Sequence, residues 1–170
     1  MEPIAHLEWT LGISLIIFGI LGEPLGGLEF LLLGLGSVFP DLFDLLLFSG
    51  KRFSIGHREL SHTVFFILGL ALLSTLYPLL QFLLLGSLLH LLQDILAGRT
   101  PVYLFSPWTH KGGICVVTKE QSIMIGGWVR EILKGAYIGS ENIGDELSWF
   151  WLQTIIGTWI LILGIILYFG

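Results

Sequence analysis

The sequence has few charged residues and only one cysteine. Lys, Arg, Asp and Glu together make up 12% of its 170 residues, about half the share of a typical soluble domain. The lone Cys115 excludes an intrachain disulfide and a cysteine-only metal site. The net charge of −5 disfavours nucleic acid as a partner. The sequence has no Walker loop, GxSxG elbow or GxGxxG motif, so nothing in it points to nucleotide binding or serine hydrolysis.

Apolar residues, in contrast, account for 54% of the chain. This composition predicts an integral membrane protein of one domain, residues 1–170, in contact with the lipid bilayer. Five segments approach the ~20 apolar residues that a spanning helix needs. They are residues 7–22, 28–48, 64–77, 79–97 and 148–169. The start of the chain lacks the basic region of a removable signal peptide, so we expect the first segment to be retained.

The basic residues predict how these segments are oriented. All eight Lys and Arg fall in two connections, residues 49–63 and 98–147. If five segments span the membrane, both connections lie on the side of the N-terminus, and the positive-inside rule makes that side cytoplasmic. A single long helix over 64–97 would instead split the basic residues across the membrane. The sequence leaves open whether the short segment 64–77 spans the bilayer or re-enters it.

Residues 98–147 are expected to form a cytoplasmic insert. The stretches PVYLF and ICVVT flank the turn THKGG and predict a β-hairpin over 101–118. Its His110 and Lys111 belong either to a lid or to a solvated turn. One-sided apolar residues over 122–138 predict an amphipathic helix, either interfacial or packed on the bundle. The predicted fold is an all-α integral membrane bundle of about five transmembrane helices, with a small cytoplasmic β-hairpin and an interfacial helix between the fourth and fifth.

Seven ionisable side chains are predicted to converge at the cytoplasmic boundary. They are His6, Asp41, Asp44, His57, His62, His90 and Asp94. Asp41 and Asp44 are three residues apart and His90 and Asp94 are four apart, so each pair shares a helix face. Ionisable groups inside membrane helices are costly and indicate a functional site. Taken singly, Asp44 also fits a helix cap, His6 an interfacial residue, and His90 with Asp94 a structural hydrogen-bonded pair.

Four histidines and three aspartates together predict a site for a divalent metal. Imidazole and carboxylate ligands suit zinc, with iron and manganese as alternatives. Seven ligands exceed the needs of one tetrahedral ion, so one or two ions fit, and a two-metal site is suited to phosphoester hydrolysis.

The stretch GHRELSH adds two candidate catalytic residues. Arg58 either binds a phosphate oxygen or is a positive-inside anchor. Glu59 is either a base, a group that orients a ligand, or an exposed glutamate. The two histidines are five residues apart, so an HExxH protease is unsupported.

Three stretches of sequence carry a family resemblance. The order GSVFPD, GHRELSHT and LLHLLQDILAG followed by LFSPW resembles the YdjM-type family of inner-membrane metal-dependent hydrolases, over about residues 6 to 108. The resemblance implies metal ligands at Asp41, His57, His62, His90 and Asp94, with His6 a weaker match. The chain departs from the family pattern at Phe43, where the second acidic residue is expected, and at Ser61, where threonine is common. The order of His and Asp elements is also loosely similar to the zinc-dependent phospholipase C and single-strand nuclease superfamily, although this chain has no clear second HxxxE pair.

These features predict a membrane-embedded, metal-dependent hydrolase of the inner membrane. Its expected substrate is a phosphoester of a lipid or lipid-linked molecule, reached at the cytoplasmic interface. The alternative is a metal-binding transporter or sensor, which the nearly uncharged outer halves of the segments, such as LIIFGIL, disfavour. In a third interpretation, a metal only fixes the helices. Protein partners cannot be identified from the sequence.

Overall fold

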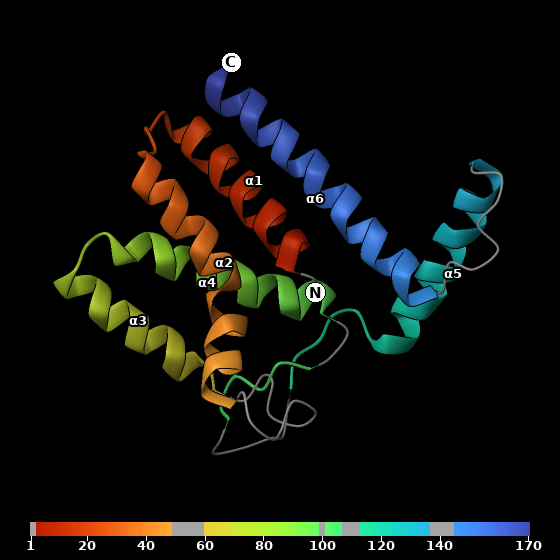
Figure 1. The fold of residues 1–170 in the computed structure, drawn as a ribbon, viewed down its shortest axis with the longest axis horizontal. Helices are drawn as coiled ribbons and strands as arrows, with labels where there is room; N and C mark the ends of the chain where they lie inside the picture. Colours follow the sequence, from red (N-terminus) through yellow and green to blue (C-terminus); the bar gives the residue numbers. More distant parts are fainter. Residues whose placement is uncertain (1–2, 49–59, 99–100, 107–112, 137–144) are drawn as a thin grey trace.

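The computed structural model describes residues 3–48, 60–98, 101–106, 113–136 and 145–170. Six helices and no extended strand lie within these ranges. They are α1 (Pro3–Leu21), α2 (Gly27–Phe48), α3 (Val64–Leu76), α4 (Leu80–Ala97), α5 (Lys119–Ala136) and α6 (Asp145–Phe169). In Figure 1, α1 lies between α2 and α6, while α3 and α4 form a helical hairpin that crosses α2. The predicted all-helical class is therefore confirmed for the described residues.

The long apolar run 64–97 is divided, as predicted, into two helices. α3 ends at Leu76, and α4 begins at Leu80. Pro78 lies between them, and proline disfavours a helical conformation in the residue before it and lacks a donor of its own. A single long helix over this run is therefore excluded.

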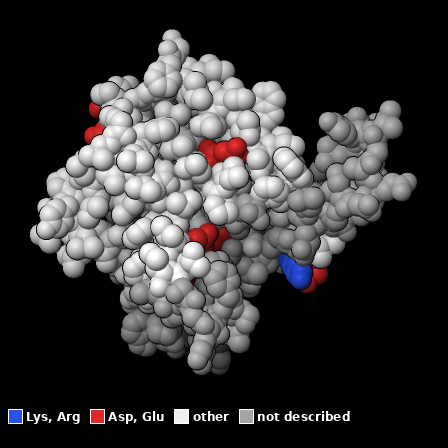
Figure 2. Space-filling view, in the orientation of Figure 1, with Lys and Arg blue, Asp and Glu red and all other residues white. Residues whose placement is uncertain are grey.

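The number of spanning helices differs from the prediction. Among the described residues, three helices are long and apolar enough to cross a membrane: α1, α4 and residues Trp149–Phe169 of α6. α3 has only 13 residues, or about 20 Å, which is shorter than the ~30 Å hydrocarbon core. α2, which carries Glu29, Asp41 and Asp44, is not among the three candidates either. The predicted count of five spans is therefore not supported. Figure 2 shows that one face of the molecule carries few charged atoms, as a chain surrounded by lipid requires.

The predicted β-hairpin over residues 101–118 is also not supported. Val102 and Ile114 form an isolated antiparallel bridge, with N···O distances of 2.9 and 3.0 Å. The next donor, Val116 N, bonds instead to Ile95 O of α4 at 2.8 Å. The second segment therefore pairs with α4 after one bridge, and no ladder forms within the described part of 101–118. Most of the expected turn, including His110 and Lys111, lies outside the described residues.

The predicted amphipathic helix is α5, which begins a few residues earlier than expected and packs against α6. Met124 and Trp128 on this helix are largely exposed, at 69% and 68%. The contact with α6 agrees with the packed interpretation, while the exposed Met124 and Trp128 suit a lipid interface.

Close backbone contacts hold α2 against α4. A Cβ atom added at Gly36 of α2 would lie 2.4 Å from Leu83 O, and one added at Gly86 of α4 would lie 2.4 Å from Leu33 O. Small residues allow helix backbones to approach closely in a membrane. This approach places the aspartates of α2 beside the histidine and aspartate of α4.

Pro40 leaves a backbone carbonyl of α2 without its helical hydrogen bond, at the point where α2 contacts α4. Proline cannot donate the helical hydrogen bond to the carbonyl four residues earlier, which here is Gly36 O. Ser87 of α4 donates its hydroxyl to that carbonyl, at 3.3 Å. The next carbonyl, Ser37 O, lies 2.6 Å from Nδ1 of His90. A break in the hydrogen bonds of α2 is thus filled by side chains from α4.

Candidate metal centre

Three helices and one turn bring five ionisable side chains together. His6 comes from the first turn of α1, Asp41 from α2, His90 and Asp94 from α4, and His62 from the turn before α3. We call these five residues the His/Asp cluster. The side chain of Asp41 is 23% exposed, and the other four members are fully buried. Buried charges are paired or bind metals, so the cluster requires a cation or protons.

The Nε2 atoms of His62 and His90 lie at ligand-like distances from each other and from one oxygen each of Asp41 and Asp94. His62 Nε2 lies 3.4 Å from Asp41 Oδ1 and 3.2 Å from Asp94 Oδ2. His90 Nε2 lies 3.7 and 3.8 Å from the same two oxygens. The two Nε2 atoms are 3.0 Å apart. A tetrahedral zinc ion with bonds of about 2.0–2.2 Å has its ligand atoms roughly 3.3–3.6 Å apart. The observed distances lie close to this range.

Asp94 presents its second oxygen to His6. Asp94 Oδ1 lies 3.4 Å from His6 Nε2, and the rings of His6 and His90 stack with centroids 4.0 Å apart. Ligand atoms of His6, His90 and Asp94 therefore form a second group close enough to hold an ion. The cluster thus contains two overlapping groups, His6 with His90 and Asp94 and Asp41 with His62 and His90, which share His90. This arrangement suits one or two ions.

The δ nitrogen of each cluster histidine contacts a group outside the cluster. His90 Nδ1 donates to Ser37 O at 2.6 Å, and His6 Nδ1 donates to Gln93 Oε1 at 2.9 Å. His62 Nδ1 lies 3.0 Å from Ser61 Oγ. A proton held on Nδ1 leaves the Nε2 lone pair free for a metal. Two such lone pairs facing each other at 3.0 Å repel, and a shared cation or proton relieves this repulsion. The donor set and its orientation therefore fit a divalent metal ion.

Gln93 is a site residue that the sequence analysis missed. It is buried and bonds to His6 through Oε1, while its Nε2 donates to Thr10 Oγ1 of α1 at 3.1 Å. These two bonds fix the amide so that its oxygen faces His6. The available signal was a polar amide inside an apolar helix, three residues after His90.

Asp44, predicted as a ligand, lies on the other side of His62. Its Oδ2 atom is 3.5 Å from His62 Nδ1, and its Oδ1 accepts from Ser61 N at 3.3 Å. It is therefore next to the nitrogen that points away from His90. This geometry favours a role in orienting His62, and the predicted ligand role of Asp44 stays a prediction.

The aspartates around His62 raise the pKa of its imidazole. Burial alone lowers the pKa of His62, but hydrogen bonds to Asp41, Asp44 and Asp94 outweigh burial and raise the pKa to about 10. A metal ion competes with this proton, because metal binding requires a neutral imidazole. When no other cation is present, the three carboxylates stabilise the protonated form of His62.

Three predicted site residues, His57, Arg58 and Glu59, lie outside the described residues. The ligand role of His57 and the catalytic roles of Arg58 and Glu59 therefore stay predictions. The other predicted residues come together as expected: His6, Asp41, His62, His90 and Asp94 form the cluster, and Asp44 lies beside it.

Comparison with known proteins gives one match. A family model described as YdjM inner membrane protein matches residues 1–169. This match extends well beyond residues 6–108, over which the sequence motifs resemble that family. Together with the apolar helices, it supports a location in a membrane. No curated protein and no solved structure matches the chain.

Proposed function

The chain belongs to the YdjM inner membrane protein family, and from this premise we propose that it is a metal-dependent hydrolase embedded in the membrane. The proposed substrate is a phosphoester of a lipid or lipid-linked molecule. The observation that carries the proposal is the pair of Nε2 atoms of His62 and His90, 3.0 Å apart in a buried site. One oxygen of Asp41 and one of Asp94 each lie 3.2–3.8 Å from both nitrogens.

The members of the His/Asp cluster would hold the ion or ions. Zinc suits the imidazole and carboxylate donors, with iron and manganese as alternatives. When bound, such an ion supplies Lewis-acid chemistry: it polarises a phosphoryl oxygen and lets water act as a nucleophile near neutral pH. The two groups of ligand atoms, which share His90, support a site for up to two ions.

The protein's own residues keep the ligands in position. Ser37 O and Gln93 Oε1 hold the protons of His90 and His6 on Nδ1, so that both Nε2 atoms face the cluster. Asp44 Oδ2 lies 3.5 Å from Nδ1 of His62, and in this proposal its charge favours the orientation in which Nε2 faces the cluster. Asp41, the only partly exposed member, lies where substrate can enter. In this proposal Arg58 binds a phosphate oxygen, and Glu59 accepts a proton from water.

The depth of the cluster suits a lipid substrate. His6 lies three residues after the start of α1, and Asp94 lies three residues before the end of α4. At 1.5 Å per residue, both are about 4.5 Å from the end of a helix long enough to span the membrane. A lipid headgroup lies at this level, whereas the middle of the bilayer is deeper. All eight Lys and Arg lie in residues 49–63 and 98–147, the two connections that adjoin the cluster in the chain. The positive-inside rule therefore supports a cytoplasmic location for the site.

One feature favours a metal transporter or sensor as the second candidate. Thr10 and Ser14 continue the face of α1 that carries His6, and all three residues are fully buried. This polar face reaches two turns further into the bundle than the cluster. An ion pathway requires polar groups at such depth, whereas a hydrolase does not need them.

Metal content and hydrolysis test the proposal together. We expect detergent-purified protein to carry roughly one or two equivalents of a transition metal by plasma mass spectrometry, and His90→Ala to carry none. Gln81→Ala is the matched control, because Gln81 is an exposed residue of the same helix. The loaded protein should release phosphate from a phosphatidic acid vesicle or cleave a soluble phosphodiester. Metal binding without either activity, combined with metal uptake into sealed vesicles, would establish the transporter instead.

A further inference from the structure

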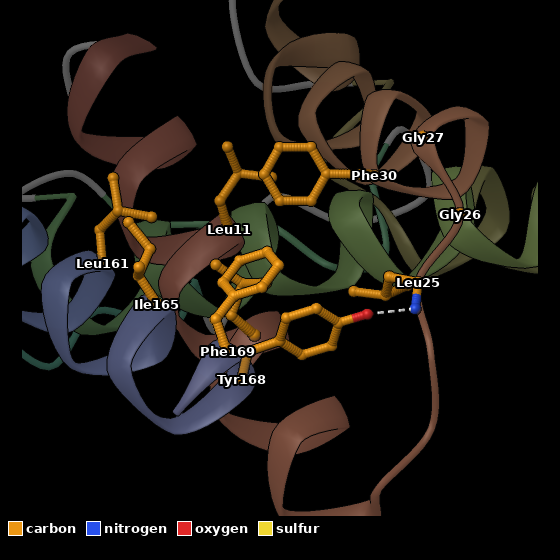
Figure 3. Close-up of a pocket in the computed structure, with 10 residues that line it drawn as sticks. Leu11, Leu25, Gly26, Gly27, Phe30, Leu161, Ile165, Tyr168 and Phe169 are labelled. Carbon is orange, nitrogen blue, oxygen red and sulfur yellow. Dashed lines mark hydrogen bonds between the residues drawn. The ribbon is translucent and has the colours of Figure 1, made fainter.

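An apolar groove lies on a different face of α1 from the His/Asp cluster. It encloses about 450 Å³ between α1, the start of α2 and the end of α6 (Figure 3). Its floor includes Leu11 and Leu15, which follow His6 by five and nine residues. At 3.6 residues per turn, they lie roughly 140° and 180° around α1 from His6. The groove and the cluster are therefore separate sites.

The groove is within the part of the molecule that faces lipid. α1 and residues Trp149–Phe169 of α6, which form its floor and one wall, are both long and apolar enough to span a membrane. Phe30 forms part of the opposite wall. Gly26 and Gly27 also line this wall, and because they carry no side chain they leave space in the groove. The volume falls in the range of about 300–1,000 Å³ typical of ligand sites. The lining is almost entirely apolar, so the hydrocarbon chain of a surrounding lipid is chemically suited to fill the groove.

A polar group is present at one end of the groove. The hydroxyl oxygen of Tyr168 accepts a hydrogen bond from Leu25 N (Figure 3). Its own proton has no acceptor among the residues that the structure describes, so it is available to donate. Tyr168 is partly buried, and the amphipathic side chain of tyrosine suits a site with one apolar and one polar end. An ester or phosphate oxygen at the head of a lipid chain would supply one.

The charge around this end selects the kind of headgroup. Glu23 is exposed in the connection between α1 and α2, and the carboxylate of Glu29 bonds to Gly26 N. Residues 3–48 and 145–170 contain no Lys or Arg. In Figure 2, red atoms and no blue atoms lie at the upper left, where Figure 1 shows this connection. Anionic headgroups bind basic residues, whereas this acidic edge attracts an ammonium group.

We infer that the groove binds one acyl chain of a phospholipid with an ammonium headgroup, placing its ester or phosphate oxygens at Tyr168. The binding site lies at the end of the bundle opposite to His6, because α1 ends and α2 begins there. It is independent of the metal-dependent hydrolysis proposed above. The bound lipid fills the space between α2 and α6.

Photocrosslinking tests this inference with a matched pair of glycine variants. A Cβ atom added at Gly27 or at Gly69 meets nothing within 4 Å. Gly27 lines the groove, while Gly69 is exposed on α3, away from it. Gly27→Phe therefore places a ring in the groove, and Gly69→Phe adds the same ring elsewhere. The probe is phosphatidylethanolamine with a diazirine at the end of one acyl chain, in vesicles of phosphatidylethanolamine and phosphatidylglycerol.

In the wild type, we expect peptides with Leu11, Phe30 and Ile165 to carry most of the crosslinks, located by mass spectrometry. Gly27→Phe should reduce this labelling severalfold, and Gly69→Phe should leave it unchanged. Labelling spread evenly over the helices, or unaffected by Gly27→Phe, overturns the site. Unlabelled phosphatidylethanolamine should compete better than phosphatidylglycerol, and equal competition overturns the headgroup assignment.

A second variant keeps the test decisive if Gly27→Phe does not fold. Tyr168→Phe retains the ring and removes the hydroxyl, so it should lower labelling and weaken the preference for phosphatidylethanolamine. An unchanged preference contradicts the role of the hydroxyl. Metal content should be the same in all these variants, so that loss of lipid binding and failure of the metal proposal are separate results.

Discussion

Helix α1 packs against α6 and against α4 in different ways. Against α6 the contact is made by backbone: a Cβ atom added at Gly12 would lie 2.7 Å from Leu161 N, and one added at Gly164 would lie 2.6 Å from Gly12 O. Against α4 the contact is made by polar side chains, with Gln93 bonded to both His6 and Thr10. Side-chain hydrogen bonds also cross the α1–α6 interface, from Trp9 Nε1 to Gln153 O and from Thr158 Oγ1 to Glu8 Oε1. One helix thus has an interface that is mainly close-packed and another in which polar side chains reach the candidate metal centre.

The difference shows how a membrane bundle separates its scaffold from its site. Helices in lipid associate through close packing of small residues and through interhelical hydrogen bonds. The α1–α6 interface relies mainly on the first, and none of its glycines contributes a ligand. The α1–α4 interface relies on the second, and its polar groups belong to the candidate metal centre. We therefore expect damage to the two interfaces to have different consequences.

The largest effect is expected for His90→Ala. His90 Nε2 belongs to both groups of ligand atoms, so its loss opens each of them. Loss of a residue that only orients a ligand lowers metal affinity by at most roughly 100-fold. We expect His90→Ala, which removes a ligand, to lower metal affinity by more than this. Chelator competition on the purified protein measures the affinity, and Gln81→Ala is the control. Retention of metal at wild-type affinity would show that the ions, if any, are held elsewhere.

Glycine variants compare the α1–α6 interface with the α2–α4 contact that positions the candidate metal centre. Gly86→Val on α4 meets Leu33 O of α2, and Gly164→Val on α6 meets Gly12 O of α1. Overpacking of this kind costs roughly 1–3 kcal/mol, so both variants should unfold at lower temperature. Only Gly86→Val should also lose metal, because it separates the helices that carry Asp41 and His90.

Thermal unfolding and metal content should be measured on the same preparations. If Gly164→Val stays folded and yet loses its metal, the two interfaces of α1 are coupled and the separation of scaffold from site is wrong. If Gly86→Val keeps its metal, the cluster tolerates movement between α2 and α4.

Much of the cluster was predictable, because ionisable residues in an apolar sequence are conspicuous. His90 and Asp94 share a helix face by spacing alone, and the loop and helix ends brought His6 and His62 toward them. Gln93 was overlooked because it is uncharged. The role of Ser37 could not be predicted, because its contribution is a backbone carbonyl located beside the gap that Pro40 leaves in α2.

The errors in the fold have a different origin. Hydropathy indicates which segments are apolar, but it does not measure their depth in the bilayer. α3 was counted as a span although its 13 residues are too few to cross the membrane. The stretch that was expected to form a hairpin has an apolar run on each side of a glycine-containing turn. Val116 nevertheless bonds to Ile95 of α4 rather than continuing the ladder. A nearby helix carbonyl can replace a strand partner, and sequence alone does not show that it is close.

A smaller effect is expected at Gln93, which orients His6. Gln93→Leu keeps the approximate volume but leaves His6 Nδ1 without its acceptor. We expect metal affinity to fall by about 10–100-fold, with little change in fold. Gln93→Glu retains an acceptor oxygen and should recover part of the affinity. A purely structural role would instead make both variants bind metal as the wild type does and differ only in stability.

The smallest effect is expected for Asp44→Asn, and it decides between the two roles of Asp44. Asparagine keeps an oxygen that can accept from Ser61 N, and it removes only the charge beside His62 Nδ1. If Asp44 orients His62, affinity should fall by about tenfold, the lower end of the range for such residues. Asp41→Asn is the matched comparison, because it places an amide among the ligand atoms themselves and should cost far more. If the two variants lose metal equally, Asp44 is a ligand, as the sequence predicted. The position of its Oδ2 atom near His62 Nδ1 would then describe only the protonated, metal-free site.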